Sequence, residues 1–228
     1  ALPISNEVHI AGIICWKSLD GGYSYVPTTA WSLPNSVGYN HADVHVLEWL
    51  GNTIYSGSDG GIYKSTNYAE DWVDLTSGLG IRQFYKIAIS ATNPELVTGG
   101  AQDNGSSILK ANGWIDWLGA DGMDCVVSPL DANIIWGTSQ NGGIYRTDNG
   151  GLSYRGLPRP NEGNWVTPLA QEPNSNVIYG GWQGVYKSTD LGASWTKLSG
   201  NTITAKLSVL AVAPSNPQYI YASTGPVL

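Results

Sequence analysis

Residues 184–195, Gly-Val-Tyr-Lys-Ser-Thr-Asp-Leu-Gly-Ala-Ser-Trp, contain the pattern that decides the fold. This stretch is typical of a short strand, a tight polar turn and an aromatic residue that opens the next strand. Ser188 and Asp190 offer side-chain oxygens to the backbone N–H groups of the turn, and Gly192 can adopt positive φ. The local chemistry therefore predicts a β-hairpin in which Trp195 packs back onto its own sheet.

The same arrangement occurs three more times along the chain. An Asp or Asn at position 20, 67, 149 or 190 is followed, five residues later, by an aromatic residue: Tyr25, Trp72, Tyr154 or Trp195. The intervals between these Asp or Asn positions are 47, 82 and 41 residues, and the long middle interval holds a further hairpin-like segment at 107–117. A period of about 40 to 47 residues is that of a four-stranded propeller blade.

The full pattern Ser-x-Asp-x-Gly-x-Ser-Trp resembles the Asp-box, or BNR, repeat of β-propellers, as in sialidases, sortilin-type receptors and xyloglucan-active glycosidases. The copies around Asp20 and Asp190 match closely, whereas Asn67 and Asn149 replace the Asp and Ala69 replaces the Gly. The resemblance implies that the boxes lie on the outer rim, where their acidic residues are structural. It also implies a secreted or cell-surface protein with a polysaccharide or protein ligand.

Recurring apolar segments predict an all-β fold of four-stranded antiparallel blades, each in the order strand A, turn, strand B, loop, strand C, Asp box, strand D. We expect residues 1–228 to form a single β-propeller region. The partial blades at both ends do not combine into one complete blade, so we expect the chain to be an excerpt of a longer propeller, commonly seven-bladed in such proteins, with further domains; an unusual small closure is the alternative. Complete blades are expected near 43–76, 84–118, 123–157 and 164–199, and partial blades at 1–30 and 205–228.

Composition excludes several classes of protein. The chain is 42% hydrophobic and only 13% charged, with 29 Gly, 10 Trp and 13 Tyr residues, as expected for a folded β-rich domain. Its net charge of −7 provides no basic surface for nucleic acid or an anionic membrane. No apolar run is long enough for membrane insertion. Cys15 and Cys125 are expected to be buried free thiols, and no fingerprint of a cofactor is present.

Propeller geometry predicts where a ligand binds, because the D-to-A and B-to-C connections share one face around the central channel. A concave site with convergent polar groups and a few aromatics is the usual form of a ligand pocket. The alternative is that these loops are polar only because they are solvated turns. The expected ligand-binding residues on this face are His41, His45, Asp59, Tyr85, Gln102, Asp103, Asn104, Trp165 and Trp182.

The segment His41-Ala42-Asp43-Val44-His45 is the most specific part of this set. On a regular strand, alternation would place His41, Asp43 and His45 on one face. Successive side chains on one face are roughly 6.5 to 7 Å apart, so a metal ion would need further ligands from neighbouring loops. We assign no metal here, because a structural histidine hydrogen-bonded beside the channel explains the pattern better.

The sequence favours extracellular or cell-surface binding of a ligand, most simply a carbohydrate, over catalysis. One alternative is a glycoside hydrolase that uses paired carboxylates, for which Asp43 and Asp121 are the best candidates. Another is a protein-interaction or structural scaffold within a larger surface protein. Sialidase activity is disfavoured, because that family clusters three arginines and the arginines of this chain do not fall in three loops of one face: Arg82, Arg146, Arg155 and Arg159.

Overall fold

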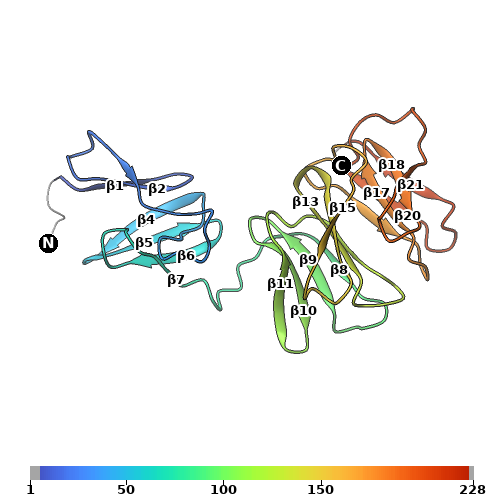
Figure 1. The fold of residues 1–228 in the computed structure, drawn as a ribbon, viewed down its shortest axis with the longest axis horizontal. Coiled ribbons are helices and arrows are strands. Elements are labelled where there is room, and N and C mark those ends of the chain that lie inside the picture. Colours follow the sequence, from blue (N-terminus) through green and yellow to red (C-terminus); the bar gives the residue numbers. More distant parts are fainter. Residues whose placement is uncertain (1–5, 226–228) are drawn as a thin grey trace. The chain divides into compact units, whose positions relative to one another are not determined.

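The computed structural model describes residues 6–225 and is almost entirely β-structure, with one 3₁₀ turn, η1 (Gln140–Gly142). The strands form six antiparallel sheets (Figure 1). The chain divides into two compact units, residues 1–81 and residues 82–228. Within the described range, no helix has the length and hydropathy needed to cross a membrane.

The first unit contains two of the sheets. The three-stranded sheet has the order β1 (Val8–Ala11), β2 (Cys15–Ser18) and β3 (Val26–Pro27). The four-stranded sheet is a meander of β4 (Val44–Leu50), β5 (Thr53–Ser58), β6 (Gly61–Ser65) and β7 (Val73–Asp74). The Val44 N–H donates to the Gly12 carbonyl at 2.7 Å, which joins the start of β4 to the end of β1.

The second unit contains three four-stranded meanders and one two-stranded sheet. The first meander comprises β8 (Phe84–Ile89), β9 (Val97–Ala101), β10 (Gly105–Lys110) and β11 (Gly113–Leu118). The second comprises β12 (Cys125–Val127), β13 (Ile135–Ser139), β14 (Gly143–Thr147) and β15 (Arg155–Leu157). The third comprises β16 (Leu169–Gln171), β17 (Ile178–Trp182), β18 (Gly184–Ser188) and β19 (Thr196–Lys197), and the last sheet comprises β20 (Val209–Val212) and β21 (Ile220–Ser223).

Successive sheets of the second unit meet through their first strands. Strand β8 lies beside β12, β12 beside β16, and β16 beside β20. Meanders that succeed one another in this way, with their first strands on the inside, have the architecture of β-propeller blades. The predicted all-β propeller fold with four-stranded antiparallel blades is therefore confirmed.

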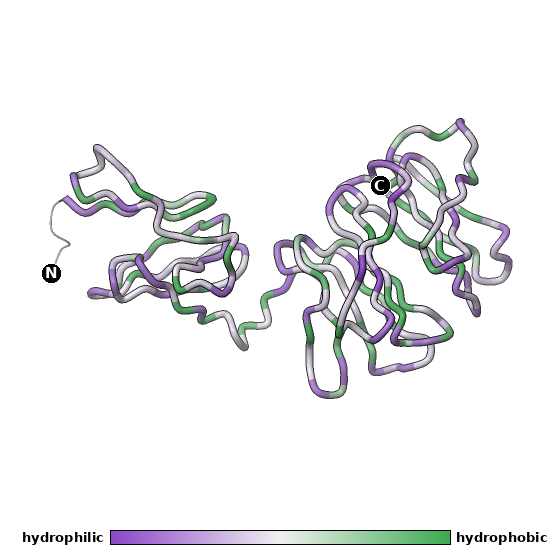
Figure 2. Tube along the Cα trace, in the orientation of Figure 1, coloured by the Kyte–Doolittle hydropathy of each residue, from purple (hydrophilic) through white to green (hydrophobic). Residues whose placement is uncertain are grey.

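The apolar core lies between neighbouring sheets. Trp136 and Ile144 of one sheet pack against Leu169, Ile178 and Trp182 of the next, and all five are buried. Figure 2 shows the same division along the chain, with hydrophilic stretches at many turns and hydrophobic stretches mainly in the strands. Burying each such side chain stabilises the fold by roughly 1.5 to 3 kcal/mol, so contact between blades is a major source of stability.

In four sheets, the turn between the last two strands has a defined hydrogen-bond pattern, and we call it the repeat turn. In Ser188–Ser194, the Ser188 hydroxyl accepts from the Gly192 N–H at 2.8 Å and donates to Asp190 at 2.7 Å. The Asp190 carboxylate also accepts from the N–H of Ser194 at 2.9 Å and from its hydroxyl at 2.5 Å. These bonds hold the pKa of Asp190 at about 2, the largest effect coming from the Ser194 hydroxyl.

Three other repeat turns keep this arrangement, at 18–24, 65–71 and 147–153. The Asn67 carboxamide oxygen accepts from the Asp71 N–H at 3.0 Å, as a carboxylate does in the turns with Asp. Ala69 takes the place of glycine at a φ of 64°, although an L-residue pays roughly 1 to 2 kcal/mol for this left-handed conformation. Asn and Ala are thus compatible with the same turn.

The aromatic residue after each turn packs as predicted in the clearest case. The Trp195 ring lies edge-on to the ring of Trp182 in its own sheet, with centroids 4.8 Å apart. Tyr154 contacts Tyr145 of its own sheet but remains 52% exposed. Cys15 and Cys125 are buried free thiols, as predicted, and burial raises their pKa values to about 11 and about 12.

Candidate functional site

In the second unit, loops from consecutive blades are joined at one end of the sheets. The Gly122 N–H donates to the Ala101 carbonyl at 3.1 Å, and the Gly163 N–H to the Asn141 carbonyl at 3.0 Å. Each bond runs from the segment before one blade to the end of the second strand of the preceding blade or to the loop after it. We call the resulting surface the polar rim, made of residues 83–85, 102–104, 119–124, 139–142 and 161–167.

Asp121 is the central acidic group of the polar rim. One of its carboxylate oxygens accepts the backbone N–H of Asp103 at 2.8 Å, and the other accepts the side-chain amide of Gln140. Asp121 is 9% exposed, and the three residues come from three different loops. Asp103 is in the left-handed region, with a φ of 57°, which directs its N–H toward the carboxylate. Asp121 therefore links the loops of two neighbouring blades within the polar rim.

Tyr85 and Trp165 form an aromatic pair on this rim. The Trp165 indole Nε1–H donates to the Tyr85 hydroxyl at 3.2 Å, although the two residues are far apart in the sequence. Trp165 is 47% exposed. Its backbone N–H donates to the side chain of Asn164 at 2.8 Å, and Asn164 in turn donates to Ser208 at 3.0 Å. The indole is thus held in place while much of its surface faces solvent.

Tyr85 reaches this position because strand β8 contains an irregularity. Phe84 pairs with Ala101 and Lys86 pairs with Gly100, so Tyr85 is the extra residue between them. Such a bulge redirects a side chain relative to a regular strand. Alternation along the sequence does not reveal a bulge, and the Tyr85 to Trp165 contact was not anticipated, although both residues were predicted to contact ligand.

The amide residues Gln102 and Asn104 shape the loop after β9. The Gln102 N–H donates to the Gln83 carbonyl at 2.9 Å, and the Asn104 side chain donates to the Gln102 carbonyl at 2.9 Å. Arg82, which the sequence analysis did not assign to the site, donates to the Asn104 carbonyl at 3.3 Å and to Asp116 at 3.1 Å. These bonds fix the loop that presents Asp103.

Trp182 has a different place from the one predicted. It is fully buried, and its Nε1–H donates to the Gly142 carbonyl at 3.0 Å. Its ring also packs edge-on against Tyr186. Trp182 is therefore a core residue that supports the rim from below, which corrects its assignment as a ligand-stacking residue. A Trp at the end of a strand can point inward or outward, and sequence alone does not distinguish the two.

Asp124 is a second buried acid behind the rim. Its carboxylate accepts the Cys125 N–H at 2.8 Å and the Leu169 N–H of the next blade at 3.0 Å. Burial raises its pKa to about 6, although the Leu169 N–H bond and the charge of Lys86 lower it. Because both acceptor atoms bind backbone N–H groups of strands, Asp124 links two blades.

The first unit carries the remaining predicted residues. His45 Nε2 lies 2.6 Å from Asp59 Oδ1, within hydrogen-bond distance, and the histidine side chain is 68% exposed. The His41 ring packs directly on Gly60, where no Cβ would fit, and its Nδ1 lies 3.0 Å from the Ala42 carbonyl. Asp43 is exposed, and its carbonyl accepts the Asp59 N–H at 3.3 Å.

The predicted alternation of residues 41–46 is wrong for a local backbone reason. Strand β4 begins only at Val44, and Asp43 before it has a φ of 57°, outside the extended region. The pairing of β4 with β5 also shifts between Val44 and Val46, so His45 lies at a bulge and Val46 is 54% exposed. Within this unit, Asp43 and Asp59 supply two carboxylates, fewer ligands than calcium takes.

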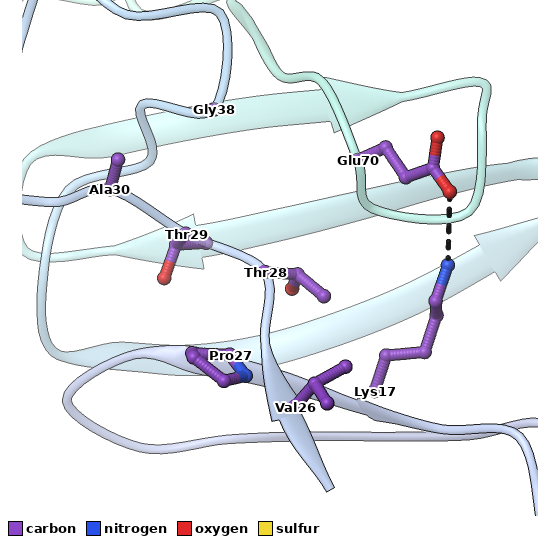
Figure 3. Close-up of a pocket in the computed structure, with 8 residues that line it drawn as sticks. All are labelled: Lys17, Val26, Pro27, Thr28, Thr29, Ala30, Gly38 and Glu70. Atoms are coloured by element: carbon purple, nitrogen blue, oxygen red, sulfur yellow. Dashed lines mark hydrogen bonds and ion pairs between the residues drawn. The ribbon is translucent and has the colours of Figure 1, made fainter.

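Each unit also has a surface groove. One of about 520 Å³ in the first unit lies between the segment after β3 and the repeat turn of the next sheet, with Lys17 and Glu70 3.4 Å apart across it (Figure 3). Another, of about 410 Å³, adjoins the polar rim and is lined partly by Gln140, Tyr145 and Arg159. The second groove shares Gln140 with the Asp121 cluster, and we regard it as the more relevant of the two.

No family model matches the chain, and no curated protein matches it by sequence. Among solved structures, an ancestral GH74 enzyme has 18% identity and a TM-score of 0.48, over 93% of this chain and 32% of that one. The GH74 xyloglucanase from Xanthomonas campestris has 15% identity and a TM-score of 0.41, over 82% and 35% of the two chains. YCF48 bound to D1 peptide has 15% identity and a TM-score of 0.43, over 95% and 72%. The chain spans about a third of the length of the two GH74 proteins.

Proposed function

We propose that this chain binds a carbohydrate on the polar rim of residues 82–225, as part of an extracellular or cell-surface β-propeller. The observation that carries the proposal is the exposed indole of Trp165, which is fixed by its hydrogen bond to Tyr85. A sugar ring presents C–H groups on one face and hydroxyls at its edge. An aromatic surface beside amide and carboxylate groups suits both features.

The polar partners for the sugar hydroxyls are expected from the neighbouring loops. Gln140 belongs both to the Asp121 cluster and to the adjoining groove, which also contains Arg159. The Arg159 guanidinium donates to the Asn141 carbonyl at 2.9 Å and so lies along the rim. A guanidinium and a carboxamide are donors that a neutral or acidic sugar can use.

A glycoside hydrolase is the second candidate, because the rim contains a buried carboxylate at Asp121. Both of its oxygens already accept hydrogen bonds, from the Asp103 N–H and from Gln140. Glycoside hydrolysis also needs a general acid. Asp43, which the sequence suggested as the partner of Asp121, belongs to the first unit.

A glycan array combined with a polysaccharide-hydrolysis assay separates these functions. We expect the wild-type protein to bind a defined set of glycans without releasing reducing sugar. Turnover that disappears in Asp121→Asn would establish a hydrolase instead. If the protein neither binds nor cleaves any glycan, the carbohydrate proposal fails and a protein ligand takes its place. Fractionation of the source cells tests the proposed location.

A further inference from the structure

The groove beside the polar rim differs in charge from two other grooves of the structure. Among the described residues, its lining includes one guanidinium, that of Arg159, and no carboxylate. The groove of the first unit contains both Lys17 and Glu70, and another groove in the second unit, of about 570 Å³, contains both Lys110 and Glu95. The groove beside the rim therefore carries a local positive charge on a chain whose net charge is −7. We call it the Arg159 groove.

Arg159 also differs from the other arginines in its partners. Each of the other three contacts an Asp side chain: Arg82, Arg146 and Arg155. Among residues 82–225, no carboxylate pairs with the Arg159 guanidinium, which donates instead to the Asn141 carbonyl at 2.9 Å. A backbone carbonyl carries no net charge, and a guanidinium has five N–H donors. The charge of Arg159 and most of its donors are thus left for a ligand.

Two hydroxyl groups add donors to the Arg159 groove. A Cβ at Gly143 would collide with Ser139 Oγ and would lie 3.5 Å from the Tyr145 hydroxyl oxygen. Both hydroxyls therefore border the space that this glycine leaves open, and both residues line the groove. The Ser139 side chain makes no capping hydrogen bond with η1, which it precedes. A hydroxyl can donate its hydrogen to an anion.

The carboxamide of Gln140 completes the set of donors. One of its N–H groups donates to the Asp121 carboxylate, which leaves the second N–H for another acceptor. Asp121 itself does not line the groove. The sheet that carries the groove, β12–β15, lies between two complete four-stranded sheets, β8–β11 and β16–β19. The groove is therefore open although the neighbouring blades on both sides are present.

The Arg159 groove is connected to the aromatic part of the polar rim. The Asn141 carbonyl that accepts from Arg159 also accepts the Gly163 N–H, at 3.0 Å. Gly163 is two residues before Trp165, and Cα atoms so spaced are at most about 7 Å apart. The cation and the exposed indole thus belong to segments that meet at one carbonyl, and one oligosaccharide can contact both.

We propose that the Arg159 groove binds the carboxylate of an acidic sugar, so that the glycan on the polar rim contains a uronic acid residue. This inference rests on the carbohydrate binding proposed above. A guanidinium forms two parallel hydrogen bonds with a carboxylate, a geometry that a neutral hydroxymethyl group does not offer. The net charge of −7 repels densely charged polymers. A mostly neutral glycan with isolated uronic acid residues therefore fits best.

Isothermal titration calorimetry with matched oligosaccharides tests the proposal. The probes are oligosaccharides that contain uronic acid, and each is paired with the neutral product of reducing its carboxylates to hydroxymethyl groups. We expect wild type to bind an acidic probe at least about tenfold more tightly than its reduced counterpart. Arg159→Gln should lose this preference but bind the reduced counterpart like wild type. Arg155→Gln, which changes an exposed arginine outside the groove, is the matched control and should keep the preference.

The outcomes separate this inference from the proposed function. Equal affinity for acidic and reduced probes, with binding that still depends on Trp165, would overturn the role of Arg159 and leave carbohydrate binding intact. A preference for the acidic probe that survives in Arg159→Gln would also overturn it. If no member of any pair bound, the proposed function and this inference would fail together. A sulfate ester of the reduced probe is the third ligand, and tighter binding of this ester than of the carboxylate would refute selection of a uronic acid.

Discussion

The guanidinium of Arg146 donates to the backbone carbonyl of Leu191 at 2.5 Å and so fastens β14 to the repeat turn of the next blade. Arg146 is only 6% exposed, and its loss would leave a carbonyl with one donor fewer. We expect Arg146→Met to lower the free energy of unfolding by about 1.5 to 3 kcal/mol, the usual range for a hydrogen bond to a charged group. Urea denaturation measures the change.

A neighbouring arginine provides the control for this prediction. The Arg155 side chain is 58% exposed and contacts the carboxylate of Asp148, which also pairs with Arg146 at 2.7 Å. Exposed ion pairs contribute little, so Arg155→Met should change the free energy of unfolding by less than about 1 kcal/mol. If the two variants were equally destabilised, contact with Leu191 would not be the source of the effect.

The second prediction concerns the hydroxyl group of the residue that begins each repeat turn. Ser188 is 1% exposed, and its hydroxyl accepts the N–H groups of both Gly192 and Asp190. Ser188→Ala should lower the free energy of unfolding by about 1 to 3 kcal/mol, because these two N–H groups lose their acceptor. Ser188→Thr should retain most of the stability, since Thr147 holds the equivalent turn with the same bonds. If Ser188→Thr unfolded at the same temperature as Ser188→Ala, the hydroxyl group would not be the source of the stabilisation.

Buried Asp124 predicts a specific dependence of stability on pH. Its pKa is raised from 3.8 to about 6, mainly by burial, so the folded state binds a proton more tightly than the unfolded state. Its contribution to stability is complete below about pH 4 and is lost as pH rises through about 6. The difference between these pKa values corresponds to about 3 kcal/mol.

Replacing Asp124 isolates its contribution to the pH dependence of stability. The free energy of unfolding of wild type should fall relative to that of Asp124→Asn between pH 4 and pH 6.5, as measured by urea denaturation at each pH. Glu95→Gln, which changes an exposed carboxylate, should follow wild type across the same range. If the free energies of unfolding of wild type and Asp124→Asn differed by the same amount at every pH, the raised pKa of Asp124 would be contradicted.

The repeat turns explain why the fold was predictable from the sequence. Ser188, Asp190 and Gly192 act on backbone groups within the same turn, so a local pattern was enough to identify the hairpin and its recurrence. The interval between turns then indicated the number of strands in each sheet. Residues of this kind interact with near neighbours in the sequence, and their geometry follows from local chemistry.

The candidate site was less predictable because its geometry depends on local irregularities and long-range packing. Bulges displace Tyr85 and His45, and positive φ values reorient Asp43 and Asp103. Trp182 turns into the core because the preceding sheet supplies an apolar surface for it. Strand alternation contains none of this information, so loops were correctly recognised as polar while the orientation of individual side chains was not.

The most direct test of the account measures carbohydrate affinity for wild type and two tryptophan variants by isothermal titration calorimetry, with the glycan that the array identifies. Trp165 and Trp31 are similarly exposed, at 47% and 51%, but only Trp165 lies on the polar rim. We predict that Trp165→Ala weakens binding at least about tenfold, which corresponds to about 1.4 kcal/mol, and that Trp31→Ala binds like wild type. Unchanged affinity in Trp165→Ala would contradict the proposal that the polar rim is the carbohydrate-binding site.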